Sequence, residues 1–206
     1  MNYFLKYLRI DNYFFLSFFF IFLTTIFYFL KISEERKNKV YLILFYLTIS
    51  FFILWSLFLS FYQYFIWKNH PLSKYLLPPY NKINYYLSYA YFHFWRDLVF
   101  RLIGLLIIVL FMKFLNFIFR RDIFYDDEKI LIPYLSLFFR FPYNALFLAF
   151  GFFILSLTIF LSIFTSPVSI NSTRYSFRNY WLYLALILFI AQPFILSNYE
   201  FLKFTP

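Results

Sequence analysis

The stretch 40-VYLILFYLTISFFILWSLFLSFYQYFIW-67 decides the fold, because its 28 residues include no charged side chain. A helix of about 20 mainly apolar residues crosses the core of a bilayer. The stretch therefore predicts a transmembrane helix that is tilted or that continues past the headgroups. Its apolar residues do not alternate with polar ones, which indicates a helix rather than a strand of a membrane barrel.

Four further apolar stretches are suited to crossing a bilayer, and they are residues 13–30, 98–119, 143–165 and 180–196. Residues 71–97 are rich in Tyr, Trp, Lys and His and are broken by Pro78 and Pro79, which is typical of an amphipathic segment lying at the membrane interface. We expect an all-α integral membrane protein with about five transmembrane helices and this interfacial segment. Residues 1–206 would form a single membrane domain.

The stretch between the third and fourth predicted spans, residues 120–141, contains the charged run RRDIFYDDEKIL. Mixed charge over a short run favours the tip of a solvated loop. The alternative is a docking site for a neighbouring subunit.

The composition indicates lipid as the main solvent, since 64% of the residues are hydrophobic and 14% are charged. Soluble domains are about a quarter charged. The 37 Phe and 21 Tyr residues, together with Ile, Asn and Lys, have A/T-rich codons and indicate an A/T-biased genome, such as that of an organelle or a reduced bacterium. The start, MNYFLKYLRIDNYF, has neither a signal-peptide nor a transit-peptide pattern, which favours synthesis inside the compartment where the protein works.

The charge pattern points to lipid as a partner. The net charge of +10 fits contact with anionic headgroups on both faces, and nothing calls for nucleic acid. Lys and Arg are shared about evenly between the two sides, so the positive-inside rule predicts no orientation.

Cations near the ends of the third predicted span are the candidate binding residues. Lys113, Asn116 and Arg120 recur at spacings that place them on one helix face. Aromatic rings at headgroup depth beside cations suit an anionic, cardiolipin-like phospholipid. The predicted lipid-binding residues are Trp95, Arg96, Arg101, Lys113, Arg120 and Arg121. Acidic side chains of partner subunits are the alternative occupants of these positions.

Several function classes are disfavoured by what the sequence lacks. The five predicted spans contain no Asp or Glu, which a proton pump or cation-coupled transporter would need as a titrating group. The chain has no Cys, and His70 and His93 are its only histidines, so we predict no catalytic site, no metal and no cofactor other than bound phospholipid.

Gly104 and Gly151 stand alone, which predicts helices that do not pack tightly by themselves. Ser and Thr within the spans are expected to bond to their own or a neighbouring helix.

The Phe/Tyr/Ile-rich, cysteine-free composition resembles the hydrophobic subunits encoded in protist mitochondrial genomes, those of ciliates especially. Two local stretches carry further resemblance. FWRDL, Phe94 to Leu98, is similar to the W-W-R-D-V segment before a membrane helix of cytochrome c oxidase subunit 3, with Phe94 in place of a Trp and without the His pair that follows in that family. IGLLIIVLF, Ile103 to Phe111, resembles the third helix of the sixth membrane subunit of complex I, without its tyrosine.

This resemblance implies a non-catalytic, multi-pass subunit of a respiratory-chain complex of the mitochondrial inner membrane, complex IV or complex I. It would support assembly, lipid contacts and contacts with other subunits during electron transport. The alternative is a small transporter or channel in which the cationic third helix lines an anion path.

Overall fold

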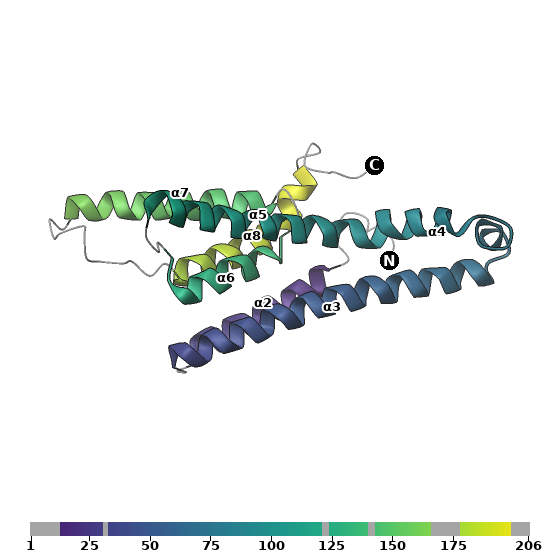
Figure 1. The fold of residues 1–206 in the computed structure, drawn as a ribbon, viewed down its shortest axis with the longest axis horizontal. Coiled ribbons are helices and arrows are strands. Elements are labelled where there is room, and N and C mark those ends of the chain that lie inside the picture. Colours follow the sequence, from purple (N-terminus) through teal and green to yellow (C-terminus); the bar gives the residue numbers. More distant parts are fainter. Residues whose placement is uncertain (1–12, 31–32, 121–123, 140–142, 166–177, 199–206) are drawn as a thin grey trace.

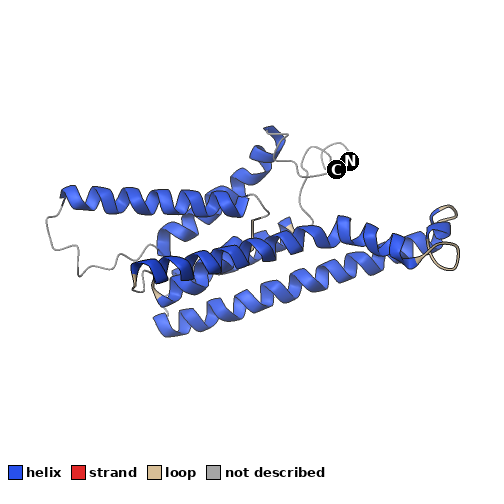
Figure 2. Cartoon of the chain, turned by 45° about the horizontal axis from the view of Figure 1, so that its top comes forward, coloured by secondary structure: helices blue, strands red, loops and turns tan. Residues whose placement is uncertain are grey.

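The computed structural model describes residues 13–30, 33–120, 124–139, 143–165 and 178–198, and every regular element in these ranges is a helix (Figures 1 and 2). The prediction of an all-α chain is confirmed for these residues. The elements in chain order are α2 (Phe14–Phe29), α3 (Glu34–Asn69), the 3-10 helix η1 (Ser73–Leu76), α4 (Ile83–Ala90), the π-helix η2 (Tyr91–Trp95), α5 (Arg96–Phe119), α6 (Asp126–Ser136), α7 (Tyr143–Thr165) and α8 (Arg178–Asn198).

Each of the five predicted apolar stretches forms a helix, and these helices are α2, α3, α5, α7 and α8. Two continuous helical stretches, Glu35–Asn69 and Ile83–Ile118, are long and apolar enough to cross a membrane, judged by length and composition. The described apolar parts of the others are shorter, namely Phe14–Phe29, Tyr143–Ile154 and Tyr180–Ala191.

The segment 71–97 differs from its prediction. Residues 83–95 form α4 and η2 and continue directly into α5, rather than making a separate segment that lies along an interface. After Pro78 and Pro79 no proline interrupts the chain before Phe119, so the helix runs on, and the π-helical turn of η2 is accommodated within it. The joined helix α4–η2–α5 runs antiparallel to α3, and its α4 and η2 parts pack on α3 to form a long hairpin (Figure 1).

A small aromatic cluster closes the far end of this hairpin. Trp67 packs edge-on against Tyr86, with ring centroids 5.7 Å apart, and Leu77 and Ala90 complete the buried group. The Tyr86 hydroxyl donates a hydrogen bond to the carbonyl of Ser60, which ties α4 to α3.

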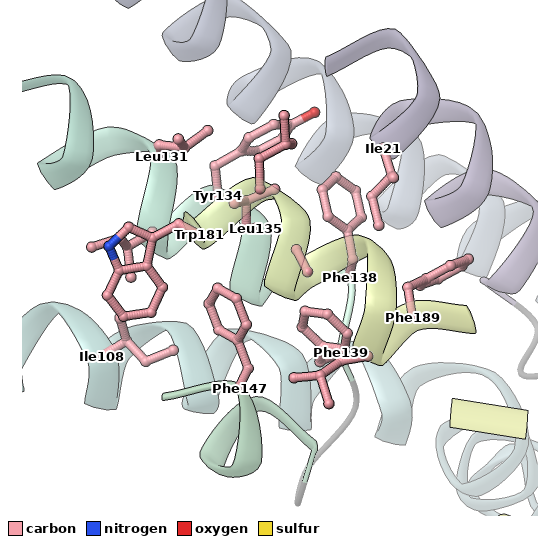
Figure 3. Packing of buried hydrophobic residues seen from close by; sticks show 14 of the residues in the cluster. Ile21, Ile108, Leu131, Tyr134, Leu135, Phe138, Phe139, Phe147, Trp181 and Phe189 are labelled. Carbon is pink, nitrogen blue, oxygen red and sulfur yellow. The ribbon is translucent and has the colours of Figure 1, made fainter. Parts of the chain in front are cut away.

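The predicted loop 120–141 is the largest departure from the sequence analysis. Within it, α6 contacts α3, α5 and α8, and residues 131–139 are all buried. Figure 3 shows Tyr134, Leu135, Phe138 and Phe139 at the centre of the main core, facing side chains of the surrounding helices. The charged run marks only the start of α6, and the apolar residues after it supply the burial that makes this segment a core element.

Both glycines lie where helices meet, contrary to the prediction of loose packing. A Cβ on Gly104 of α5 would come within 1.5 Å of Asn144 Nδ2 on α7. A Cβ on Gly151 of α7 would come within 2.0 Å of Trp181 Cζ3 on α8. A single glycine therefore suffices for close approach when its partner is one projecting side chain rather than a second backbone.

The predicted hydrogen bonds of Ser and Thr to their own helices are confirmed. Thr24, Thr48 and Ser56 each donate to the carbonyl four residues earlier, at 2.6–3.0 Å. Thr24 also exchanges a 2.9 Å hydrogen bond with the Tyr134 hydroxyl, which joins α2 to α6.

Candidate functional site

Among the charged residues that the structure describes, Arg101 is the most completely buried, with 1% of its surface exposed. Its Nη1 donates to the carbonyl oxygen of Leu137 at 2.7 Å. Its guanidinium carbon lies 5.5 Å from the ring centre of Tyr13 and 5.6 Å from that of Phe52. The guanidinium is thus enclosed by α2, α3 and the residue that follows α6.

The end of α6 offers this cation a favourable electrostatic environment. Leu137 is the residue at the C-terminal cap of α6, where backbone carbonyls have no partner within the helix. The partial negative charge at a helix C-terminus stabilises a cation, and aromatic faces add cation–π attraction. The arrangement offsets part of the cost of burying a charge.

A layer of hydrogen bonds crosses the bundle about two helical turns before Arg101, at Phe94. The Tyr13 hydroxyl contacts Ser56 Oγ on α3 and donates to the carbonyl of Phe94 at 2.6 Å. Phe94 lies in η2, the π-helical turn, and such turns often occur at functional sites. These hydrogen bonds hold the start of α2 level with the middle of α3 and the start of α5.

Trp95 and Arg96 flank this layer. Trp95 is half-buried, and its Nε1 donates to Ser60 Oγ on α3 at 3.1 Å. Its polar group is therefore used within the hairpin. Arg96 is also half-buried, and its Nε is buried without a hydrogen-bond partner among the described residues. Arg96, at the start of α5, stays a predicted lipid-binding residue.

The predicted lipid-binding cations do not share one environment. Arg101 lies inside the bundle, so its guanidinium is not available to a lipid headgroup, and this residue is removed from the predicted lipid contact. Lys113 is exposed on α5, and Arg120 is exposed at the residue that ends α5. Arg120 adopts a left-handed backbone conformation with φ of 50°, a common way to end a helix. Arg121 lies outside the described residues.

The separation of Arg101 from Lys113 also bears on the transporter alternative. An anion path along the third helix requires its cations to line one continuous surface. Arg101 is enclosed by aromatic rings, whereas Lys113 is on the outside of the bundle. The two cations therefore do not line a common path.

The acidic run at the start of α6 has a structural role in this fold. Glu128 Oε2 accepts a hydrogen bond from the backbone nitrogen of Tyr125 at 3.2 Å, which caps the helix start. Lys129 pairs with Asp126 at 2.9 Å. Negative charge in the first turn also complements the positive end of the helix dipole.

The two histidines occupy separate positions in the hairpin. His70 Nδ1 accepts from the backbone nitrogens of Leu72 and Ser73, each at 3.3 Å, and so shapes the turn after α3. The ring of His93 packs on that of Tyr89 with centroids 4.2 Å apart. Among the described residues there is no group of three or more His, Asp or Glu side chains arranged to hold a metal ion.

The sequence analysis missed the buried residues that organise the bundle. Asn144 is 2% exposed and Trp181 is 2% exposed, and each packs against a glycine of a neighbouring helix. Gly104 lies three residues after Arg101 on the same helix face. This spacing is the sequence pattern that could have predicted a close helix crossing at Gly104.

Comparison with known protein families, with curated proteins and with solved structures finds no match to this chain.

Proposed function

We propose that this chain is a multi-pass membrane protein that serves as a non-catalytic structural subunit of a respiratory-chain complex in the mitochondrial inner membrane. The observation that carries the membrane part is the arrangement of polar and apolar side chains. Large apolar side chains cover the outside, with Phe15 71%, Phe153 65% and Phe117 80% exposed. The polar and charged side chains buried inside include Ser17, Thr24, Thr48, Ser56, Arg101 and Asn144.

This distribution suits a lipid environment. Water-soluble monomers rarely expose large continuous apolar surfaces, because contact with water is unfavourable. Lipid chains solvate the exposed Phe, Leu and Ile side chains, while polar groups in the interior find partners on neighbouring helices. The hydroxyl hydrogen bonds of Thr24, Thr48 and Ser56 are of this kind.

The assignment to a respiratory complex rests on the resemblance in composition and on the sequence Phe94–Leu98. The described residues supply structural roles for Arg101 and for the acids of α6, which supports a scaffold rather than an active site. Phospholipid bound near Arg96 on one side and near Lys113 and Arg120 on the other would belong to this role.

The transporter alternative has less support, because Arg101 and Lys113 lie in different environments. A membrane channel would need them on a shared water-filled surface.

The test is purification of native membrane complexes in mild detergent, followed by native gel separation and mass spectrometry. We expect this chain to co-migrate with subunits of a respiratory complex and to resist extraction by alkaline carbonate. Recovery of the chain only as a free monomer would contradict the structural role, and release by carbonate would contradict the membrane assignment.

A further inference from the structure

The far end of the long hairpin extends beyond the rest of the molecule. We call residues 57–95 the arm; it comprises the second half of α3, the turn with η1, and α4 with η2. Figures 1 and 2 both show the arm projecting past the bundle of α2, α5, α6, α7 and α8. The arm packs mainly on itself, through the cluster around Trp67 and Tyr86.

The hydrogen bonds of Tyr13 mark where the bundle ends and the arm begins. Tyr13 directly precedes α2 and bonds Ser56 and Phe94, so α2 starts at the base of the arm. Residues 34–39 of α3 carry five charges, so its apolar part beside the bundle is residues 40–56, roughly 25 Å long, and α5 is roughly 35 Å long at 1.5 Å per residue. A bilayer core is about 30 Å thick, so a core that begins at Val40 ends within one turn of the base of the arm. The 13 residues 57–69 extend roughly 20 Å farther along the same axis.

One face of the arm carries an apolar groove of about 400 Å³. Its lining residues are Phe58, Phe61, Tyr62, Phe65, Ile66 and Asn69. They recur every three or four residues, so they form a single stripe along α3. Phe61 and Phe65 on this stripe are 71% and 63% exposed.

The arm is also strongly cationic. No Asp or Glu occurs from residue 36 to residue 96, whereas Lys68, Lys74 and Lys82 are all exposed at its end. Lys68 follows Phe61 by seven residues and Phe65 by three, which places it on the groove's face of α3. The groove is thus apolar along its length and positively charged at its tip.

We propose that the arm projects beyond the bilayer and that its groove takes an acidic amphipathic helix of a partner protein. The apolar side of that helix would pack on Phe61 and Phe65, and its carboxylates would face Lys68, a mode of helix recognition in a groove. The inference rests on the proposed membrane placement and names the chemistry of one partner in the complex.

Other occupants fit less well. A second copy of this chain would bring another arm without acids against the first, and like charges would repel. An anionic membrane surface would attract the lysines at the tip. It would not fill a groove that runs along α3 and opens to its side.

The first experiment tests where the arm lies. Because the natural sequence has no Cys, each variant carries a single reactive thiol. Single substitutions Leu54→Cys, Tyr62→Cys and Leu72→Cys place thiols in the bundle, in the groove and at the tip, at side chains that are 59%, 58% and 75% exposed. The full chain in phosphatidylcholine nanodiscs is treated with a membrane-impermeant maleimide. We expect the Tyr62 and Leu72 variants to react and the Leu54 variant to be protected.

Protection of the Tyr62 variant to the same degree as the Leu54 variant would place the groove in lipid and overturn the inference. Reaction of the Leu54 variant would contradict the proposed membrane placement itself, so the two failures are distinguishable.

The second experiment tests the occupant with a synthetic 20-residue helical peptide that carries Leu on one face and Glu on its flanks. A peptide with Lys in place of Glu is the control. We expect the acidic peptide to bind the natural chain in nanodiscs, and Phe61→Ser and Lys68→Glu each to weaken binding on the order of tenfold. Lys39→Glu, a matched change at an exposed position near the start of α3, should leave binding unchanged.

Equal binding of the two peptides, or binding that is insensitive to Phe61→Ser and Lys68→Glu, would overturn the proposal. So would binding to phosphatidylserine vesicles that depends on Lys68 but not on Phe61, which would indicate a membrane surface. Disulfide cross-linking of two copies through the Tyr62→Cys variant would identify a second copy as the occupant instead.

Discussion

The guanidinium of Arg101 donates a 2.7 Å hydrogen bond to the carbonyl oxygen of Leu137, across 36 residues of sequence. This contact joins the first turns of α5 to the end of α6, the helix that contacts α3, α5 and α8. A buried cation is thus placed at the negative end of a helix dipole, beside the adjoining rings of Tyr13 and Phe52. The relationship explains why a charge can lie inside so apolar a bundle.

We expect Arg101→Ala to destabilise the fold by about 2–4 kcal/mol, because it removes a hydrogen bond to a buried carbonyl and leaves a cavity. Arg101→Met keeps most of the volume and should cost less, about 1–3 kcal/mol. Thermal unfolding in detergent, followed by circular dichroism, measures both. A Met variant as stable as the natural chain would show that the free energy needed to bury the charge equals the stabilisation that its contacts provide.

Replacement of either glycine by alanine should loosen the bundle. A Cβ at residue 151 would lie 2.0 Å from Trp181 Cζ3, and one at residue 104 would lie 1.5 Å from Asn144 Nδ2. Overpacking costs about 1–3 kcal/mol, which exceeds the gain of about 1 kcal/mol in helix propensity. Gly151→Ala should cost more, because the indole ring is rigid and the amide of Asn144 can rotate away.

The double variant Gly104→Ala with Asn144→Gly is the matched control for steric conflict at this crossing. It moves the small residue to the other helix and should recover part of the lost stability in the same unfolding measurement. Equal stability of Gly104→Ala and the natural chain would show that α5 and α7 are not in close contact there.

The helices could be predicted from the sequence because each is a long apolar run, and length is a local property. The buried position of residues 126–139 could not be predicted, since a short run that begins with three acids is typical of a loop. Its burial depends on contacts with α3, α5 and α8, which are distant in sequence. Arg101 is one of the predicted lipid-binding cations, but its contact with the carbonyl of Leu137 is set by the tertiary fold. The lone glycines were misjudged because their partners, Asn144 and Trp181, belong to other helices.

The Tyr13 hydroxyl should contribute measurably to the alignment of three helices. Tyr13→Phe keeps the ring against Phe52 and removes the hydrogen bonds to Ser56 and Phe94. We expect a loss of about 1–2 kcal/mol in unfolding free energy, because the partly buried carbonyl of Phe94 loses its donor. Tyr62→Phe, at a 58% exposed position, is the control and should be neutral. An equal, small effect of both changes would contradict a bridging role for Tyr13.

Lipid retention should depend on Lys113 and Arg120 but not on the exposed Lys39 near the start of α3. Each cation near a membrane surface adds about 1 kcal/mol of attraction for an anionic headgroup, which corresponds to about fivefold in affinity. Lys113→Gln and Arg120→Gln should therefore each reduce cardiolipin retained on the purified chain by about fivefold, measured by native mass spectrometry. Lys39→Gln removes a cation that pairs with Glu35 at 2.8 Å and should leave retention unchanged. Equal retention by all three variants would show that the cations at the end of α5 do not hold lipid and would favour acidic groups of partner subunits in their place.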